Sequence, residues 1–162
     1  MQWARLSGFN PVITTASLHN TELLKSHGAT HVIDRKQPQD AIVEQVHVIV
    51  VGGLVDVAYD TIVEDDTIAL AVAAVKPGGK LVAILPTKEP LIRELSEPKN
   101  VQWITAKLHS SQHNKEAFLE LLSRLPGLLE EGVLKVRKST HSSSCHTDVL
   151  FSQLRMRYYL AG

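Results

Sequence analysis

Short apolar stretches alternate with amphipathic ones along most of the chain. β-branched or nearly continuous apolar runs predict five strands, at residues 11–15, 30–34, 55–60, 80–85 and 101–106. Helical periodicity and terminal signals predict helices at residues 20–28, 38–46, 65–75 and 118–129, with a weaker segment at 87–95. Pro126 should kink or split the last of these helices. Such alternation predicts an α/β fold with a doubly wound, mostly parallel sheet.

The two ends of the chain depart from this pattern. Residues 2–6 resemble the last turns of a helix that ends at Gly8 and leads into a strand. A helix in this position usually follows an earlier strand, so we expect the first strand of the sheet to be missing. The C-terminal stretch contains the Ser-rich run "RKSTHSSSCH" and then "FSQLRMRYYLAG", which matches neither the helical nor the strand period well.

Composition and charge exclude several classes of protein. The 17 basic residues balance the 17 acidic ones, so the charge excess of a nucleic-acid-binding protein is lacking. The longest apolar run, residues 68–75, is too short to span a membrane. The single cysteine, Cys145, excludes an intrachain disulfide and fits a reducing compartment. We therefore expect a cytoplasmic protein that binds neither nucleic acid nor membrane.

Four motifs carry a resemblance to a known family. The succession "GFNPVITTAS", "GATHVIDR", "VDVAYD" and "PGGKLV" resembles the nucleotide-binding domain of the medium-chain dehydrogenase/reductase superfamily. It is most similar to the zinc-independent fungal branch that includes trans-enoyl reductases and quinone-oxidoreductase-like proteins. The resemblance implies a truncated Rossmann-type domain over residues 1–135. It also implies that the first strand, its Gly-rich loop and a GroES-like catalytic domain are absent, and that residues 136–162 form a divergent tail.

The first expected strand ends in small hydroxyl side chains. Thr14, Thr15 and Ser17 stand where a Rossmann fold holds the adenosine ribose, and an acidic residue there would favour NAD. Because none is present, a 2′-phosphate has room, and NADP(H) is the expected cofactor. The resemblance implies that Arg35 faces the adenine or its phosphate, where a guanidinium can stack or pair. The alternative is that these four residues are solvated strand-end groups without a ligand.

The resemblance also places the nicotinamide between two loops. It implies that Leu85, Pro86 and Thr87 border this ring on one side and that Leu108 borders it on the other. The catalytic residues remain unknown, because nothing in the chain supplies the opposite wall of such a site. Asp60 ends the third expected strand and is interpreted as a turn residue that faces the cofactor cleft rather than as an acid catalyst.

Histidines and the cysteine form two local clusters. His109 and His113 are four residues apart, and His141, Cys145 and His146 lie in the unpatterned tail. A closed zinc site usually shows two tight pairs of ligands, which these spacings do not provide. We therefore expect no metal site.

Two functions follow from these observations. The first is the NADP(H)-binding portion of an oxidoreductase that resembles enoyl and quinone reductases. We expect this portion alone to be weakly active or inactive, and to bind its cofactor weakly or not at all. The alternative is a non-catalytic interaction or dimerisation module. A sheet without its first strand leaves unpaired backbone groups, and the tail, a second copy in a homodimer, or another protein could fill the gap. A third hypothesis is that the chain folds poorly and has no selected function.

Overall fold

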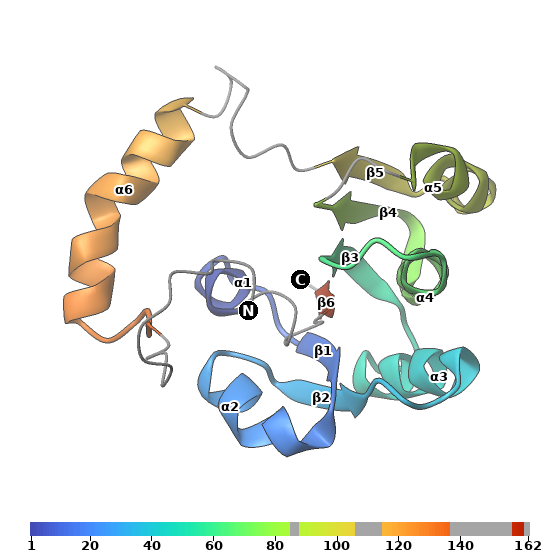
Figure 1. Cartoon of the computed structure of the whole chain (residues 1–162), viewed down its shortest axis with the longest axis horizontal. Helices are drawn as coiled ribbons and strands as arrows, with labels where there is room; N and C mark the ends of the chain where they lie inside the picture. Colours follow the sequence, from blue (N-terminus) through green and yellow to red (C-terminus); the bar gives the residue numbers. More distant parts are fainter. Residues whose placement is uncertain (85–87, 106–114, 137–156, 161–162) are drawn as a thin grey trace, which may run out of the picture. The chain divides into compact units, whose positions relative to one another are not determined.

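The computed structural model of the chain describes residues 1–84, 88–105, 115–136 and 157–160 (Figure 1). Two compact units are distinguished: Met1–Ala106 together with Phe151–Gly162, and Lys107–Leu150. The first unit contains the sheet, and the second contains a single described helix. The predicted domain boundary after residue 135 stays a prediction.

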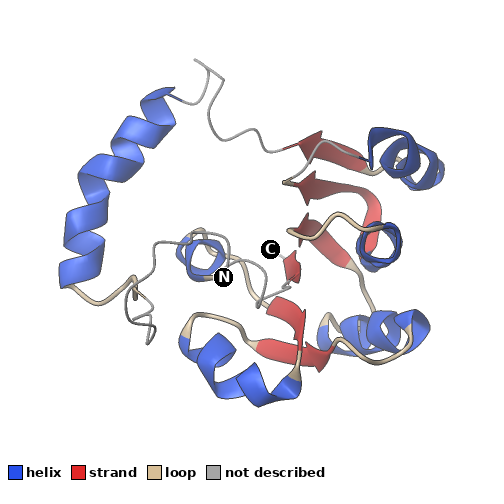
Figure 2. Ribbon diagram, viewed as in Figure 1, coloured by secondary structure: helices blue, strands red, loops and turns tan. Residues whose placement is uncertain are grey.

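A six-stranded sheet forms the centre of the first unit (Figure 2), with the order β2-β1-β6-β3-β4-β5. The strands are β1 (Val12–Ala16), β2 (His31–Asp34), β3 (Val55–Asp60), β4 (Val75–Ala83), β5 (Gln102–Thr105) and β6 (Arg157–Leu160). β1 and β2 pair in parallel, as do β3 with β4 and β4 with β5, whereas β6 pairs antiparallel with both β1 and β3.

Helices cover both faces of this sheet. The helices of the first unit are α1 (Gln2–Leu6), η1 (Leu18–Asn20), α2 (Thr21–Ser26), α3 (Gln39–Ile49), α4 (Asp65–Ala74), α5 (Glu89–Ser96) and η3 (Glu97–Lys99). Figure 1 shows α3, α4 and α5 on one face and α1 and α2 on the other. The predicted α/β, doubly wound architecture is therefore confirmed. Among the helices that the structure describes, none has the length and apolar character needed to cross a membrane.

The main core lies between the sheet and the helices α3 to α5. Ile42 and Val46, four residues apart, share one side of α3 and are buried with Ile13 and Ile33 of the sheet. Each fully buried side chain of this size stabilises the fold by about 1.5–3 kcal/mol. A smaller cluster on the opposite face joins Leu24 of α2 to Ala16 and Ala29. Burial on both faces explains why the strands are so apolar in sequence.

The start of β4 differs from its prediction. The turn at residues 77–79 was expected to separate a helix from a strand, but α4 ends at Ala74 and β4 already begins at Val75. The register against β3 shifts from Val55↔Val75 to Val57↔Lys80, so the extra residues form a bulge inside the strand. Glycine is needed there, because a Cβ on Gly79 would lie 2.8 Å from a carbonyl oxygen of β3.

The tail contains a strand that its sequence pattern does not predict. Leu160 of β6 pairs with Val12 of β1 and Val57 of β3, and Arg157 pairs with Thr15 and Asp60. In a doubly wound dinucleotide-binding sheet the first parallel strand holds this central place. Of the three expected occupants of the gap, the structure places the tail there.

Helix α6 (Lys115–Glu130) belongs to the second unit. It confirms the predicted amphipathic helix, but Pro126 lies inside one uninterrupted element and does not split it. Gly132 adopts a positive φ of 68° just after the helix, and Leu134 then donates a backbone hydrogen bond to the carbonyl of Leu128. This is the hydrogen-bonded helix ending for which glycine is suited.

Candidate functional site

The carboxyl ends of the parallel strands meet at one edge of the sheet. From β1 the chain continues to β2 on one side, and from β3 it continues to β4 and β5 on the other. Open α/β sheets bind their ligands outside the carboxyl ends at such a change of direction. β6 lies at this point, with Arg157 level with the ends of β1 and β3. This edge is therefore the candidate site.

A basic corner forms where β1 and β2 end. The backbone N–H of Arg35 donates to the carbonyl of Ala16 at 3.0 Å, which holds the residue after β2 against the end of β1. Ser17 follows as a half-buried residue, and the side chains of Arg35 and Lys36 are exposed. Asp34 accepts the backbone N–H of Lys36 at 3.0 Å, so this carboxylate is engaged by its own turn. We call Ser17, Arg35 and Lys36 the β1–β2 corner.

The two threonines of β1 lie deeper than the corner. Thr14 is 0% exposed and Thr15 is 1% exposed, and both belong to the strand between β2 and β6. Among the described residues, the Thr14 hydroxyl has no hydrogen-bond partner although it is buried. Ser17 is therefore the one predicted hydroxyl residue that reaches the surface at this end of β1.

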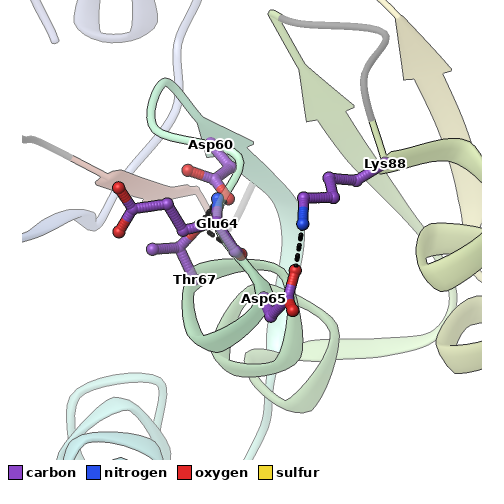
Figure 3. Close-up of polar contacts among 5 residues, drawn as sticks. All are labelled: Asp60, Glu64, Asp65, Thr67 and Lys88. Atoms are coloured by element: carbon purple, nitrogen blue, oxygen red, sulfur yellow. Dashed lines mark hydrogen bonds and ion pairs between the residues drawn. The ribbon is translucent and has the colours of Figure 1, made fainter.

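Asp60 organises the turn that leaves β3 (Figure 3). Its side chain is fully buried, and one carboxylate oxygen accepts the backbone N–H groups of Ile62 at 2.9 Å and Val63 at 3.2 Å. The other oxygen accepts the Thr67 hydroxyl at 2.5 Å. Thr67 in turn accepts the backbone N–H of Glu64 at 3.0 Å, at the start of α4. The expected turn role of Asp60 is confirmed, since these donors all come from its own turn and helix.

The turn also contains a strained residue. Val63 has a φ of 59°, in the left-handed region that β-branched residues avoid. A non-glycine residue there costs about 1–2 kcal/mol. Because the bonds to Asp60 fix Val63 and its neighbour, the buried carboxylate holds the backbone in this conformation. Strain of this kind gathers near functional sites.

The half of the edge formed by β3, β4 and their helices is acidic. Glu64, Asp65 and Asp66 stand at the start of α4, where negative charge offsets the positive end of the helix. Lys88 makes an ion pair with Asp65 at 2.8 Å, which links the starts of α5 and α4. A phosphate is therefore favoured at the β1–β2 corner rather than at α4.

Several predicted residues fall outside the described part of the chain. These are Leu85, Pro86, Thr87, Leu108 and both histidine clusters. Among the residues that are described, no three His, Cys, Asp or Glu side chains gather as they would around a metal ion. The sequence analysis did not predict Lys36 as a site residue, although it follows Arg35 directly in the run "VIDRK".

Comparison with known proteins identifies the family. The sequence profile described as zinc-binding dehydrogenase matches residues 1–123, most of the chain. The chain belongs to the zinc-binding dehydrogenase family. This member is 39% identical, over 89 residues, to the trans-enoyl reductase ACTTS2 of Alternaria alternata. The match covers 54% of this chain but only 25% of that reductase, so the chain spans a minor part of such relatives.

Solved structures share the fold of this zinc-binding dehydrogenase chain. A mycobacterial quinone oxidoreductase superposes with a TM-score of 0.69 at 22% identity, over 84% of this chain and 42% of that one. The Escherichia coli quinone oxidoreductase, solved in complex with NADPH, gives 0.68 at 23% identity, over 85% and 43%. The family match and the trans-enoyl reductase relative, together with this shared fold, confirm the predicted kinship with the medium-chain dehydrogenase/reductase superfamily.

Proposed function

We propose that this chain is the NADP(H)-binding portion of an oxidoreductase that resembles enoyl and quinone reductases. The observation that carries the proposal is the hydrogen bond from Arg35 to Ala16, which sets two exposed cations beside the end of β1. The fold neighbour from Escherichia coli was solved with NADPH, and this supports a phosphate-bearing nicotinamide cofactor here.

The β1–β2 corner fits the adenosine end of NADP(H). A guanidinium can bind a phosphate through two parallel hydrogen bonds, so Arg35 is assigned to the 2′-phosphate. Lys36 adds a point charge and Ser17 a hydroxyl donor. The side chain after β1 is the neutral Ser17, so no carboxylate at that position repels the phosphate. Thr14 and Thr15 are assigned to shaping the strand end beneath the ribose rather than to direct contact.

The reactive end of the cofactor is assigned by resemblance. Leu85, Pro86, Thr87 and Leu108 are proposed to border the nicotinamide, on the loops that follow β4 and β5. The cofactor supplies the hydride when bound, and the protein holds and orients it. Because the chain matches only 25% of the length of the Alternaria trans-enoyl reductase, we propose weak or no turnover from this chain alone.

The alternative function, an interaction or dimerisation module, was based in part on an unfilled gap at the centre of the sheet. β6 pairs with both strands that flank this position. The cofactor proposal is therefore the better supported of the two.

Calorimetric titration of the chain with NADPH and with NADH tests the proposal. We expect saturable binding with a preference for NADPH. Arg35→Ala should weaken NADPH binding by about 10- to 100-fold, because a charge-assisted hydrogen bond contributes about 1.5–3 kcal/mol, and should leave NADH binding nearly unchanged. Arg93→Ala is the matched control, since Arg93 is also an exposed arginine but lies on α5. Absence of binding, or equal losses for both cofactors in Arg35→Ala, would refute the assignment.

A further inference from the structure

The turn after β3 lies near the centre of the carboxyl edge. Asp60, the last residue of β3, is level with Arg157 of β6, which is level with Thr15 near the end of β1. Because neighbouring strands lie about 4.8 Å apart, the ends of β1 and β3 are separated by about 10 Å. The strand order places β3 between β4 and β1, where the adenosine end of the cofactor is proposed to bind. A dinucleotide that extends along this edge therefore passes residues 61–63 with its ribose and pyrophosphate groups.

This turn is held at two points. At the first point, the buried carboxylate of Asp60 accepts the backbone N–H groups of Ile62 and Val63. At the second, the side chain of Val63 is only 3% exposed and belongs to the main core. Thr61 and Ile62 lie between the two points and are half-buried. The tip of the turn is therefore fixed from both sides without a ligand.

Val63 combines a left-handed backbone with a buried side chain. Its φ of 59° lies in a region that glycine adopts freely and that β-branched residues avoid. The other non-glycine residues with a positive φ in the described part of the chain, Val51 and Asn100, have exposed side chains. The strain at Val63 is thus balanced by the burial of its side chain. Strain that the surrounding structure holds in place is typical of ligand clamps and active sites.

We propose that Val63 is a positioning residue for the cofactor: its buried side chain holds residues 61–63 in the conformation that faces the middle of the dinucleotide. The inference rests on the proposed function, since it concerns the same ligand. It adds to that function a residue that sets affinity from beneath the site, through the turn rather than by its own contact. A loop that is ordered before binding loses less conformational entropy when the ligand arrives, and this raises affinity.

Val63→Gly separates this role from a purely structural one. Glycine relieves the left-handed strain but removes the anchor in the core, while Asp60 and its backbone donors stay unchanged. If the turn must then be ordered at binding, affinity should fall by about 5- to 30-fold, the range expected for ordering one backbone residue. The ribose and pyrophosphate groups are the same in NADPH and NADH, so both should lose affinity equally. Arg35→Ala, in contrast, is expected to affect NADPH alone.

Val51→Gly is the matched control. Val51 also has a left-handed backbone, with a φ of 53°, so the substitution relieves the same kind of strain. Its side chain is 93% exposed and anchors nothing in the core. The residue lies between α3 and the amino end of β3, away from the carboxyl edge. We therefore expect Val51→Gly to bind both cofactors as the unaltered chain does.

The first measurement is calorimetric titration of the unaltered chain and both variants with NADPH and with NADH. A loss smaller than about threefold in Val63→Gly, against the expected 5- to 30-fold loss, would overturn the inference and leave the proposed function intact. A loss confined to NADPH, or an equal loss in Val51→Gly, would overturn it as well. If the unaltered chain binds neither cofactor, the proposed function fails and the inference fails with it.

The second measurement is hydrogen exchange of the unaltered chain with and without saturating NADPH. We expect the amides of Ile62 and Val63 to exchange at least about fivefold more slowly with NADPH present, because the bound ligand opposes opening of the turn. The amides of residues 51–53 should exchange at an unchanged rate. Unchanged exchange at Ile62 and Val63, or equal slowing at residues 51–53, would overturn the inference. This result stands even if Val63→Gly fails to fold, because the experiment uses no variant.

Discussion

Replacing Thr67 by valine tests how the turn after β3 is held. Thr67 is 1% exposed, and its hydroxyl donates to the buried Asp60 carboxylate at 2.5 Å. Valine has nearly the same shape but cannot donate, so one carboxylate oxygen stays buried and loses its partner. Such a loss costs about 1–3 kcal/mol. Thr67→Ser is the matched control, because it keeps the hydroxyl and removes one methyl, at about 0.8 kcal/mol.

Asp60→Ala removes the other side of the same interaction. The backbone N–H groups of Ile62 and Val63 lose their acceptor as well, and Val63 loses the support for its left-handed conformation. We expect a cost of about 3–5 kcal/mol. The double variant with Thr67→Val should be more stable than the sum of the single losses implies, by about 1.5–3 kcal/mol, because the shared charged hydrogen bond is counted twice in that sum.

Urea unfolding followed by tryptophan fluorescence provides the assay. Both tryptophans, Trp3 and Trp103, lie in the unit that contains the sheet, so the signal reports on that unit alone. The cycle built with Thr67→Ser should show no coupling to Asp60→Ala. Additivity of Thr67→Val with Asp60→Ala, within about 0.5 kcal/mol, would show that the hydroxyl–carboxylate bond does not stabilise the turn.

Three further predictions concern the same unit and the same unfolding assay. Gly79→Ala should lower the free energy of unfolding by about 1–3 kcal/mol or more, because the added Cβ meets a carbonyl oxygen of β3 at 2.8 Å. Gly78→Ala has open space around its Cβ and a φ of 75°, so it should lower the free energy of unfolding by about 1 kcal/mol. A smaller loss for Gly79→Ala than for Gly78→Ala would contradict this. Burial lowers the pKa of Lys99, so the free energy of unfolding should rise with pH below about 10.5 in the unaltered chain, and Lys99→Met should remove that rise; an identical pH dependence in both chains would count against it. Asp65→Asn breaks an exposed ion pair with Lys88 and should cost at most about 1 kcal/mol at low salt and less in 1 M NaCl; a loss that salt leaves unchanged would mean that the pair is not the cause.

Local patterns were sufficient to predict most of the sheet. The apolar runs at β1, β3 and β5 and the flanking caps and glycines gave element types that the structure confirms, because burial on both faces leaves a strong apolar signature. The prediction for the start of β4 was wrong, because Pro77 and the two glycines after it are ordinary helix-ending signals. Only the pairing with β3, through a bulge, converts them into strand residues.

Long-range pairing explains what the sequence could not predict. β6 has no periodic pattern of its own, because it is a short strand whose identity depends on the two strands that receive it. At the candidate site, the hydroxyl residues of β1 could be located in the sequence, but their depth could not. Thr14 and Thr15 are buried while Ser17 reaches the surface, and the position of Arg35 depends on a backbone bond to Ala16.

The order of synthesis gives the central position of β6 a consequence for the newly made chain. Leu160 leaves the ribosome about 100 residues after Val57, the β3 residue with which it pairs. At about 5–20 residues per second, this delay lasts roughly 5–20 s. During that time β1 and β3 are both complete, yet the strand that joins them has not been made. The nascent chain therefore exposes one unpaired edge of β1 and one of β3, at the position that β6 later fills. Unpaired strand edges promote aggregation, so protection by a chaperone matters most in this interval.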